Sequence, residues 1–234
     1  MATYYKSRPL ASYEGYWGTV TDPDGVIRDR MAEKNQYLDD IKAELAFLHS
    51  LPKGRILDVG CGPGWLLKEM EGWEKYGVEP NVDVARHAGF ESDVPCVYIQ
   101  SSVPKLPNIQ FDVIVMHHVI EHMEDPAEEL KRVHGLLKPG GILLLGTPDF
   151  DSVCARRFGE NYRLLHDKTH VSLFTRESMT RLLNDSGFTI DRLEFPFFET
   201  RHFTEENMLR MFDTSKVSPA FVGNFMTFYC HKDD

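Results

Sequence analysis

The 234-residue sequence predicts an α/β fold, a doubly wound and mostly parallel sheet with helices on both faces. Short apolar runs alternate along the chain with segments of helical periodicity. Strands that alternate with helices pair in parallel through right-handed crossovers. Within residues 55–70, one of these strands is followed by a loop with three glycines and then by a helix. Ligands bind at such turns of α/β sheets.

The first half of the chain predicts helices and four strands. Apolar residues recur at three- and four-residue spacing over residues 30–50, which indicates an amphipathic helix ending before Pro52. The expected strands are 55–59, 74–79, 94–100 and 111–116. The helices expected between them and after them are 65–70, 80–88 and 126–137.

The second half predicts the other edge of the sheet. A turn at 138–141 leads into a fifth apolar strand at 142–146, and two aromatic runs look like a closing antiparallel pair. Those runs are 190–198 and 224–231, and the expected helices are 175–187, which is capped, and 204–212, which is short and lies over the sheet. Because no linker or repeat interrupts the pattern, we expect a single domain over 1–234.

Composition excludes several classes of protein. The 26 Lys and Arg against 36 Asp and Glu give a formal charge of −10, which argues against a nucleic-acid partner. No apolar run approaches the ~20 residues that a membrane helix requires. The polar, aromatic start lacks a secretory signal, so we expect a cytoplasmic protein. The four cysteines are far apart and form no C-x-x-C pair, so we expect neither a zinc site nor disulfides.

The glycine loop is the clearest sign of a ligand. The strand ending at Asp58 continues through Gly60, Gly62 and Gly64, which exposes backbone N–H groups and a helix N-terminus. A dinucleotide motif would have Gly or Ala where Trp65 stands, so NAD is disfavoured. Glu79 follows Asp58 by 21 positions at the end of the second strand, where a carboxylate can accept both hydroxyls of an adenosyl ribose.

With these motifs, the sequence resembles the class I S-adenosylmethionine-dependent methyltransferases, in the small-molecule group that includes ubiquinone and sugar methyltransferases. The matching runs are 56–64, 77–80, 111–115, 119–126 and 137–142. They occupy the expected cofactor core, 54–148. The resemblance implies a Rossmann-like, seven-stranded sheet whose last strand is antiparallel, with S-adenosyl-L-methionine across the carboxyl ends of its strands.

The resemblance also implies site residues. The glycines would line the methionine portion of the cofactor, Glu79 the ribose and the two serines 101 and 102 the adenine edge. The full expected cofactor set is Asp58, Gly60, Cys61, Gly62, Gly64, Trp65, Glu79, Pro80, Ser101, Ser102, His117 and His118. Many relatives place an Asp where Ser101 and Ser102 stand, which makes the adenine contact differ here.

Three histidines are candidates for a catalytic base: His118, His166 and His170. Residues 118–122 match the zinc-peptidase motif H-x-x-E-H, but they follow directly on a strand, so we expect no metal ion. His166 and His170 lie after the fifth strand, and an ordinary histidine pKa of ~6.5 suits proton transfer. The alternatives are that these two histidines tie the loop to the core or, with Asp167, hold a metal.

The remaining segments are expected to choose the substrate. Residues 1–50 form an arm and helix that could close as a lid, 149–175 form a substrate-side insertion, and 176–234 form the C-terminal helix and strands. Basic residues near the insertion could bind a phosphate, carboxylate or sugar nucleotide, or could be solvated or paired with acids. These residues are Arg156, Arg157, Arg163, Lys168 and Arg201.

The expected activity is therefore methyl transfer to a small metabolite, on an oxygen of a sugar-like or anionic substrate. The alternatives are N- or C-methylation of a natural-product or quinone-type substrate, and a protein that binds S-adenosylmethionine without catalysis. We expect a monomer or homodimer.

Overall fold

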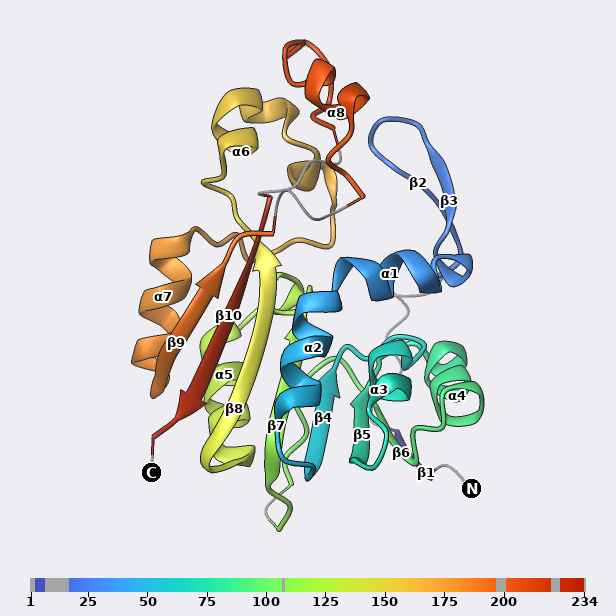
Figure 1. The fold of residues 1–234 in the computed structure, drawn as a ribbon, viewed down its shortest axis with the longest axis vertical. Helices are drawn as coiled ribbons and strands as arrows, with labels where there is room; N and C mark the ends of the chain where they lie inside the picture. The colour runs from blue at the N-terminus through green and yellow to red at the C-terminus, as the bar shows by residue number, and fades with distance from the viewer. Residues whose placement is uncertain (1–2, 7–16, 107, 197–200, 220–223, 234) are drawn as a thin grey trace.

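The computed structural model describes residues 3–6, 17–106, 108–196, 201–219 and 224–233 (Figure 1). They contain an eight-stranded sheet of order β1-β6-β5-β4-β7-β8-β10-β9. Its strands are β1 (Thr3–Lys6), β4 (Arg55–Val59), β5 (Glu74–Val78), β6 (Cys96–Ile99), β7 (Phe111–His117), β8 (Leu137–Pro148), β9 (Phe188–Glu194) and β10 (Phe225–Lys232). β10 runs antiparallel to both neighbours. The predicted seven-stranded sheet with an antiparallel last strand is confirmed, and β1 extends it at one edge.

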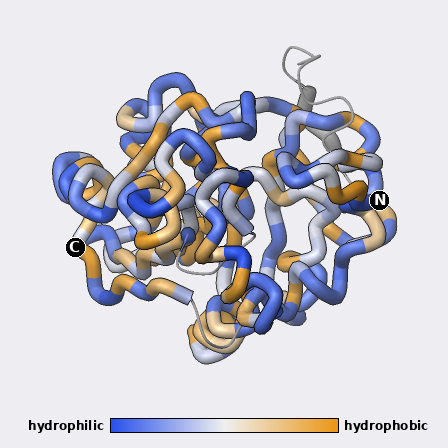
Figure 2. The backbone as a smooth tube through the Cα atoms, turned by 90° about the horizontal axis from the view of Figure 1, so that it is seen from above, coloured by the Kyte–Doolittle hydropathy of each residue, from blue (hydrophilic) through white to orange (hydrophobic). Residues whose placement is uncertain are grey.

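Helices cover both faces of this sheet (Figure 1). On one face lie α2 (Lys42–Ser50), α3 (Trp65–Glu69) and α4 (Val82–Glu91), and on the other lie α5 (Pro126–Leu136) and α7 (Arg176–Asp185). Leu48, Leu67 and Ala88 belong to the apolar cluster of the first face, whereas Leu130 and Leu183 belong to that of the second. In the view from above, apolar stretches run through the middle of the molecule between hydrophilic segments (Figure 2).

Two expectations about element boundaries are wrong. The helix expected over residues 30–50 is divided into a short 3-10 turn, α1 (Lys34–Asp40) and α2. The break falls at Ile41, whose backbone leaves helical geometry with φ −104° and ψ 19° while its side chain stays buried. In addition, β8 begins at Leu137, so residues 138–141, which were expected to form a turn, belong to the strand. Its pairing with β7 shifts register at this point.

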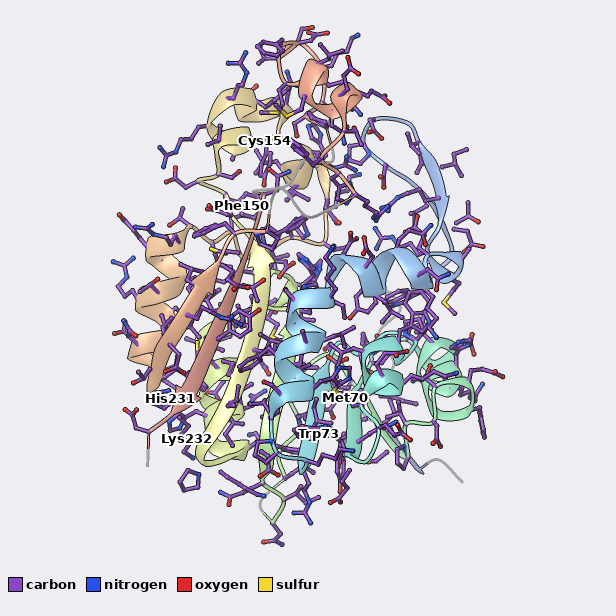
Figure 3. The ribbon with its side chains drawn as sticks, in the orientation of Figure 1. Met70, Trp73, Phe150, Cys154, His231 and Lys232 are labelled. Atoms are coloured by element: carbon purple, nitrogen blue, oxygen red, sulfur yellow. The ribbon has the colours of Figure 1, made fainter. Side chains whose placement is uncertain are left out.

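A small cap stands beyond the carboxyl ends of the strands (Figure 1). It contains α6 (Val153–Phe158) and α8 (Glu205–Arg210). Its own apolar cluster centres on Cys154, Phe158 and Tyr162, with Phe150 packed against it (Figure 3). Helix α8 therefore lies beyond the end of the sheet, and the expectation that it covers a sheet face is wrong.

The N-terminal segment makes two separate structures. Thr3–Lys6 pair with β6 in parallel, while β2 (Thr19–Thr21) and β3 (Ile27–Asp29) form a hairpin beside the cap (Figure 1). Ion pairs join this hairpin to the cap: Arg163 lies 2.9 Å from Asp22 and 3.6 Å from Asp24. Tyr13 and Tyr16 of the predicted aromatic arm lie outside the described residues.

Two expectations from composition can be compared with the described residues. None of the helices there is both long and apolar enough to span a bilayer. All four cysteines are free thiols. Cys61 is buried in the glycine loop, where burial raises the pKa of its thiol well above the usual value, helped by the charges of Asp58 and Glu79.

Candidate active site

A cavity of about 360 Å³ opens where the carboxyl ends of the central strands meet. The ends of β4, β5 and β7 contribute Gly60, Glu79 and His117 to its wall. Trp17 and Tyr37 from the N-terminal segment complete it on the opposite side. This is the edge at which open α/β sheets bind ligands, as the sequence predicted.

The glycine loop is shaped by backbone bonds. The N–H groups of Gly60 and Cys61 both donate to the carbonyl of Val78, at 2.8 and 2.9 Å, which ties the loop to the neighbouring strand. Gly60 and Gly62 have positive φ angles of 76° and 51°, a region that L side chains rarely adopt. A Cβ on Gly62 would lie 2.3 Å from the Trp17 ring, so the arm packs directly on the loop.

Gly64 does not line this cavity, although it was expected to contact the cofactor. It is the residue that precedes α3, with φ 76°. A Cβ there would meet Ser92, Val94 and Ala88 at 3.0 to 3.1 Å. Gly64 thus allows α3 to pack closely against the segment around α4 and does not contact the ligand space.

Two buried carboxyl groups lie under the loop. Glu79 is 4% exposed and accepts hydrogen bonds from the N–H of Gly62 at 3.0 Å and of Asn81 at 2.8 Å. Burial raises its pKa to about 7, although both bonds work in the opposite direction. Asp58 is equally buried, and burial together with the charge of Glu79 raises its pKa to about 8. Asp58 does not line the cavity, whereas Glu79 does.

These two carboxyl groups predict how stability changes with pH. Their folded-state pKa values lie above those of the unfolded chain, so their stabilising contribution is complete at low pH and is lost as pH rises through about 7 to 8. We expect the melting temperature of the ligand-free protein to fall between pH 5.5 and 8.5. The Asp58→Asn variant should show a shallower fall. Parallel thermal melts measure this, and equal pH slopes for the two proteins would contradict the assignment.

Aromatic rings form the wall between the arm and the loop. The buried Trp65 ring contacts the rings of Trp17 and Tyr37, each with centroids 5.8 Å apart. Tyr37 also contacts the His117 ring at 6.3 Å. Trp65, which the sequence marked as unsuited to a dinucleotide motif, therefore anchors the arm over the loop. The sequence did not single out Tyr37, although its place on the apolar face of the predicted helix was visible.

Only some of the residues expected near the adenine end of the cofactor line the cavity. Pro80 and Ser101 line it, but Ser102 does not. Gln100 lines it instead, and its side-chain amide donates to the Ser102 carbonyl at 2.6 Å. The sequence missed Gln100 because the family pattern directed attention to the two serines that follow it.

His118 lies where this cavity meets a second one of about 270 Å³, and it lines both. Its φ is +57°, unusual for a residue other than glycine, and its N–H donates to the Gly146 carbonyl at 2.8 Å. Its ring contacts those of His117 and Phe225, with centroids 4.4 and 4.6 Å away. Backbone strain of this kind gathers at functional sites.

A buried glutamate holds the His118 ring. The Glu121 carboxylate lies 3.4 Å from Nδ1 of His118 and accepts a bond from the Thr147 hydroxyl at 3.0 Å. Burial alone would raise the pKa of Glu121, but the hydrogen bond and charge of His118, with the charge of His122, lower it. Nδ1 of His118 therefore faces a carboxylate. The sequence analysis assigned no role to Glu121, although it lies within the H-x-x-E-H match at residues 118–122.

The structure separates the two candidates after the fifth strand. His170 lines the first cavity, and burial lowers its pKa despite the opposing charges of Glu121 and Asp167. His166 is exposed and lines neither cavity, so the structure does not place it with the other two candidates.

The side chains that could together bind a metal ion are not the set that the sequence suggested. In the described part of the chain, ligand atoms of Glu121, His122 and His170 lie within 4.8 Å of one another. Nδ1 of His122 and of His170 bonds the carbonyls of Thr169 and Leu164, at 2.9 and 2.8 Å. A carbonyl can only accept, so each Nδ1 carries a proton, and in the neutral ring Nε2 is the nitrogen that could bind a metal. His122 also lines the cavity.

The predicted basic cluster is largely paired with acids. Arg156 pairs with Asp151, and Arg157 donates to the Met211 carbonyl at 2.6 Å. Lys168 is exposed and lines neither cavity. Arg163 and Arg201 do line the second cavity, but Arg163 pairs with Asp22 and Asp24 and Arg201 pairs with Asp40. The alternative of pairing with nearby acids therefore holds for most of the cluster.

The mostly parallel sheet, the glycine loop and the buried Glu79 at the cavity are the features of an α/β protein that binds a ligand at the carboxyl ends of its strands. A family model described as a methyltransferase domain matches residues 30–193. The chain is 32% identical over 236 residues to a ubiquinone biosynthesis O-methyltransferase of Dinoroseobacter shibae, covering 90% of this chain and 95% of that one. The chain belongs to this methyltransferase family.

Other relatives agree with this assignment. A ubiquinone biosynthesis O-methyltransferase of Ruegeria pomeroyi is 38% identical over 153 residues, which cover 59% of this chain and 62% of that one. In fold, the chain is similar to an S-adenosylmethionine-dependent methyltransferase of Thermotoga maritima, described as a possible histamine N-methyltransferase. The TM-score is 0.62 at 23% identity, and the match covers 87% and 94% of the two chains.

The chain carries the methyltransferase domain of this family, and the first cavity has features that suit S-adenosylmethionine. The Glu79 carboxylate lines this cavity, and its two backbone bonds fix its direction. Gly60 lines the cavity and has no side chain to fill it. A Cβ at this position would lie 2.3 Å from Val119. The loop therefore allows the close backbone approach that an adenosyl ligand requires.

Proposed function

We propose that this methyltransferase acts on an oxygen of a small, hydroxylated metabolite and that His118 is the catalytic base. The observation that carries the proposal is the position of His118 at the meeting of the two cavities. The first cavity contains the glycine loop and Glu79, so the second is left for the acceptor. The names of the O-methyltransferase relatives support oxygen as the atom methylated.

The Glu121 contact determines which nitrogen of His118 acts. Because Nδ1 faces the carboxylate, the proton of the neutral ring is on Nδ1 and Nε2 is the basic atom. When bound, S-adenosylmethionine supplies a methyl carbon whose bond to sulfur breaks as the acceptor oxygen attacks, the electron pair remaining on sulfur. Nε2 of His118 receives the hydroxyl proton, and Glu121 stabilises the imidazolium that forms.

Water must be kept from this reaction, and the N-terminal segment is well placed to do so. Trp17 lies on Gly62, and the β2–β3 hairpin is joined to the cap through Arg163. We assign this segment the role of a lid over the cofactor. N- or C-methylation and cofactor binding without catalysis remain the alternative outcomes of the test below.

The His118→Asn variant tests the proposal, because asparagine tolerates the positive φ of this position. We expect kcat for methyl transfer from labelled S-adenosylmethionine to an oxygen acceptor to fall about 100-fold or more, with affinity for S-adenosylhomocysteine little changed. His166→Asn is the matched control, since His166 is exposed and lines neither cavity. Equal turnover in both variants, or methyl transfer only to amines, would contradict the proposal.

A further inference from the structure

One glutamate lies on the face of α2 that packs into the protein. Ile41, Glu44 and Leu48 are buried together, at the spacing of one helix face. Glu44 is only 3% exposed, and no ion pair within the described residues includes it. Fully buried glutamates are rare unless paired, because desolvating a carboxyl group is costly. Burial accordingly raises the pKa of Glu44.

The partner of Glu44 is a neutral hydroxyl on β10, between two apolar residues. Thr227 on β10 is 2% exposed and donates from Oγ1 to the Glu44 carboxyl at 3.1 Å. Met226 and Phe228 on either side of it are buried in the core. Two polar groups thus occupy positions that apolar residues would fill more stably.

This pair lies close to His118. Thr227 is the register partner of Gly146 on β8, and the carbonyl of Gly146 holds the His118 N–H. The His117 ring lies against Gly146, where a Cβ would be 2.5 Å from it. Glu44 and Thr227 both line the second cavity, as His118 does. A molecule presenting an oxygen to His118 therefore has Glu44 within the same chamber.

The rest of the chamber combines apolar and charged groups. Most of its exposed surface is apolar, and Leu164, Phe225 and Met226 face it. Its charged and amide residues are Asp22, Arg28, Asp40, Arg163, Arg201 and Asn224, of which the three arginines already pair with acids. Such a lining suits a molecule that has an apolar body and a few hydroxyl groups.

We propose that Glu44 and Thr227 recognise the acceptor, by accepting a hydrogen bond from a second hydroxyl of the acceptor, apart from the oxygen that is methylated. This inference rests on the proposed function and adds the residues that select its acceptor. A site built to bond a hydroxyl discriminates strongly against molecules that lack it, since its buried polar groups would be left unpaired. Glu44 is thus a specificity-determining residue.

The test compares Glu44→Leu and Glu44→Gln with the wild-type full-length chain. Methyl transfer is measured to myo-inositol, methyl glucoside, glucuronate and UDP-glucose, with catechol and 4-hydroxybenzoate as aromatic comparisons. We expect transfer to at least one of these acceptors that has a second hydroxyl, and a loss of about 100-fold in kcat/KM for it in Glu44→Leu. Calorimetry should show affinity for S-adenosylhomocysteine unchanged within about threefold.

Thermal melting provides a second readout that needs no acceptor. Glu44→Leu should melt at the same or a higher temperature, because leucine suits the apolar helix face. In the control Glu129→Leu the melting temperature should fall, since Glu129 pairs with Arg132 and accepts from the Val103 N–H at 2.7 Å. A lower melting temperature for Glu44→Leu would indicate a structural role and overturn the proposal.

The outcomes separate this inference from the function on which it rests. Cofactor binding without transfer to any of the oxygen acceptors would contradict the proposed function itself. Equal rates for wild type and Glu44→Leu on an acceptor with a second hydroxyl, or an equal loss for 4-hydroxybenzoate, which has only one, would overturn only the assignment of Glu44.

Discussion

Replacing Glu79 with alanine should weaken the binding of S-adenosylhomocysteine about 100-fold or more. A buried carboxylate that accepts two ribose hydroxyls contributes about 1.5 to 3 kcal/mol through each bond. The substitution would also leave the N–H groups of Gly62 and Asn81 without their acceptor, which loosens the glycine loop. Isothermal titration calorimetry at pH 8, where Glu79 is mostly ionised, measures the change.

The same strand offers a matched control. Glu74 is the first residue of β5, and Glu79 comes directly after the last one. Glu74 is exposed and forms hydrogen bonds with Arg55 and Tyr76. Glu74→Ala should therefore bind the ligand as the wild type does. Glu79→Gln keeps the size of the side chain and one acceptor oxygen, so we expect an intermediate loss of about tenfold. Unaltered binding in Glu79→Ala would refute the ribose assignment.

Replacing Arg163 with methionine should destabilise the protein by about 3 kcal/mol. Arg163 is 10% exposed and pairs with Asp22 and Asp24, which are 13% and 14% exposed. Breaking a buried ion pair costs about 3 to 5 kcal/mol, and the loss here lies at the lower end because Asp22 keeps Arg28 and Asp24 keeps Arg210 as partners, at 3.1 and 3.2 Å. Denaturant unfolding measures the loss, and limited proteolysis should show earlier cleavage between residues 17 and 33.

Arg156→Met is the comparison, because Arg156 pairs with Asp151 in solvent, at 69% and 50% exposure. Surface pairs of this kind contribute about 0 to 1 kcal/mol, so its unfolding curve should be close to that of the wild type. If the two variants lose the same stability, the ion pairs of Arg163 between hairpin and cap stabilise the protein no more than a surface pair does, which would contradict the prediction.

Much of the sheet could be predicted because its signals are local. The runs at 55–59 and 111–116 are continuously apolar, as strands buried on both faces are, and the structure has strands there. The capped helix after Thr175 was also visible, and its Thr175 and Ser178 form a capping box. The break at Ile41 was not visible, since the apolar spacing continues through it and packing determines the bend.

The site was predictable where one motif carries it and not where distant segments meet. The glycine loop and Glu79 lie on adjacent strands in a fixed order, so their meeting follows from topology. The contact of Trp17 with Gly62 joins an arm to a loop 45 positions away, and nothing in either segment indicates it. Glu44 and Thr227 are 183 positions apart, and each resembles a chance polar residue in an apolar run.

The place of β1 at the sheet edge bears on how the protein should be produced. Thr3–Lys6 pair with Cys96–Ile99 along β6, which satisfies backbone groups that an edge strand would otherwise present to other chains. A version beginning at residue 17 would keep the cavity residues but expose β6 as a template for intermolecular pairing. Such a shortened protein would be prone to aggregate, and an affinity tag is better attached at the C-terminus.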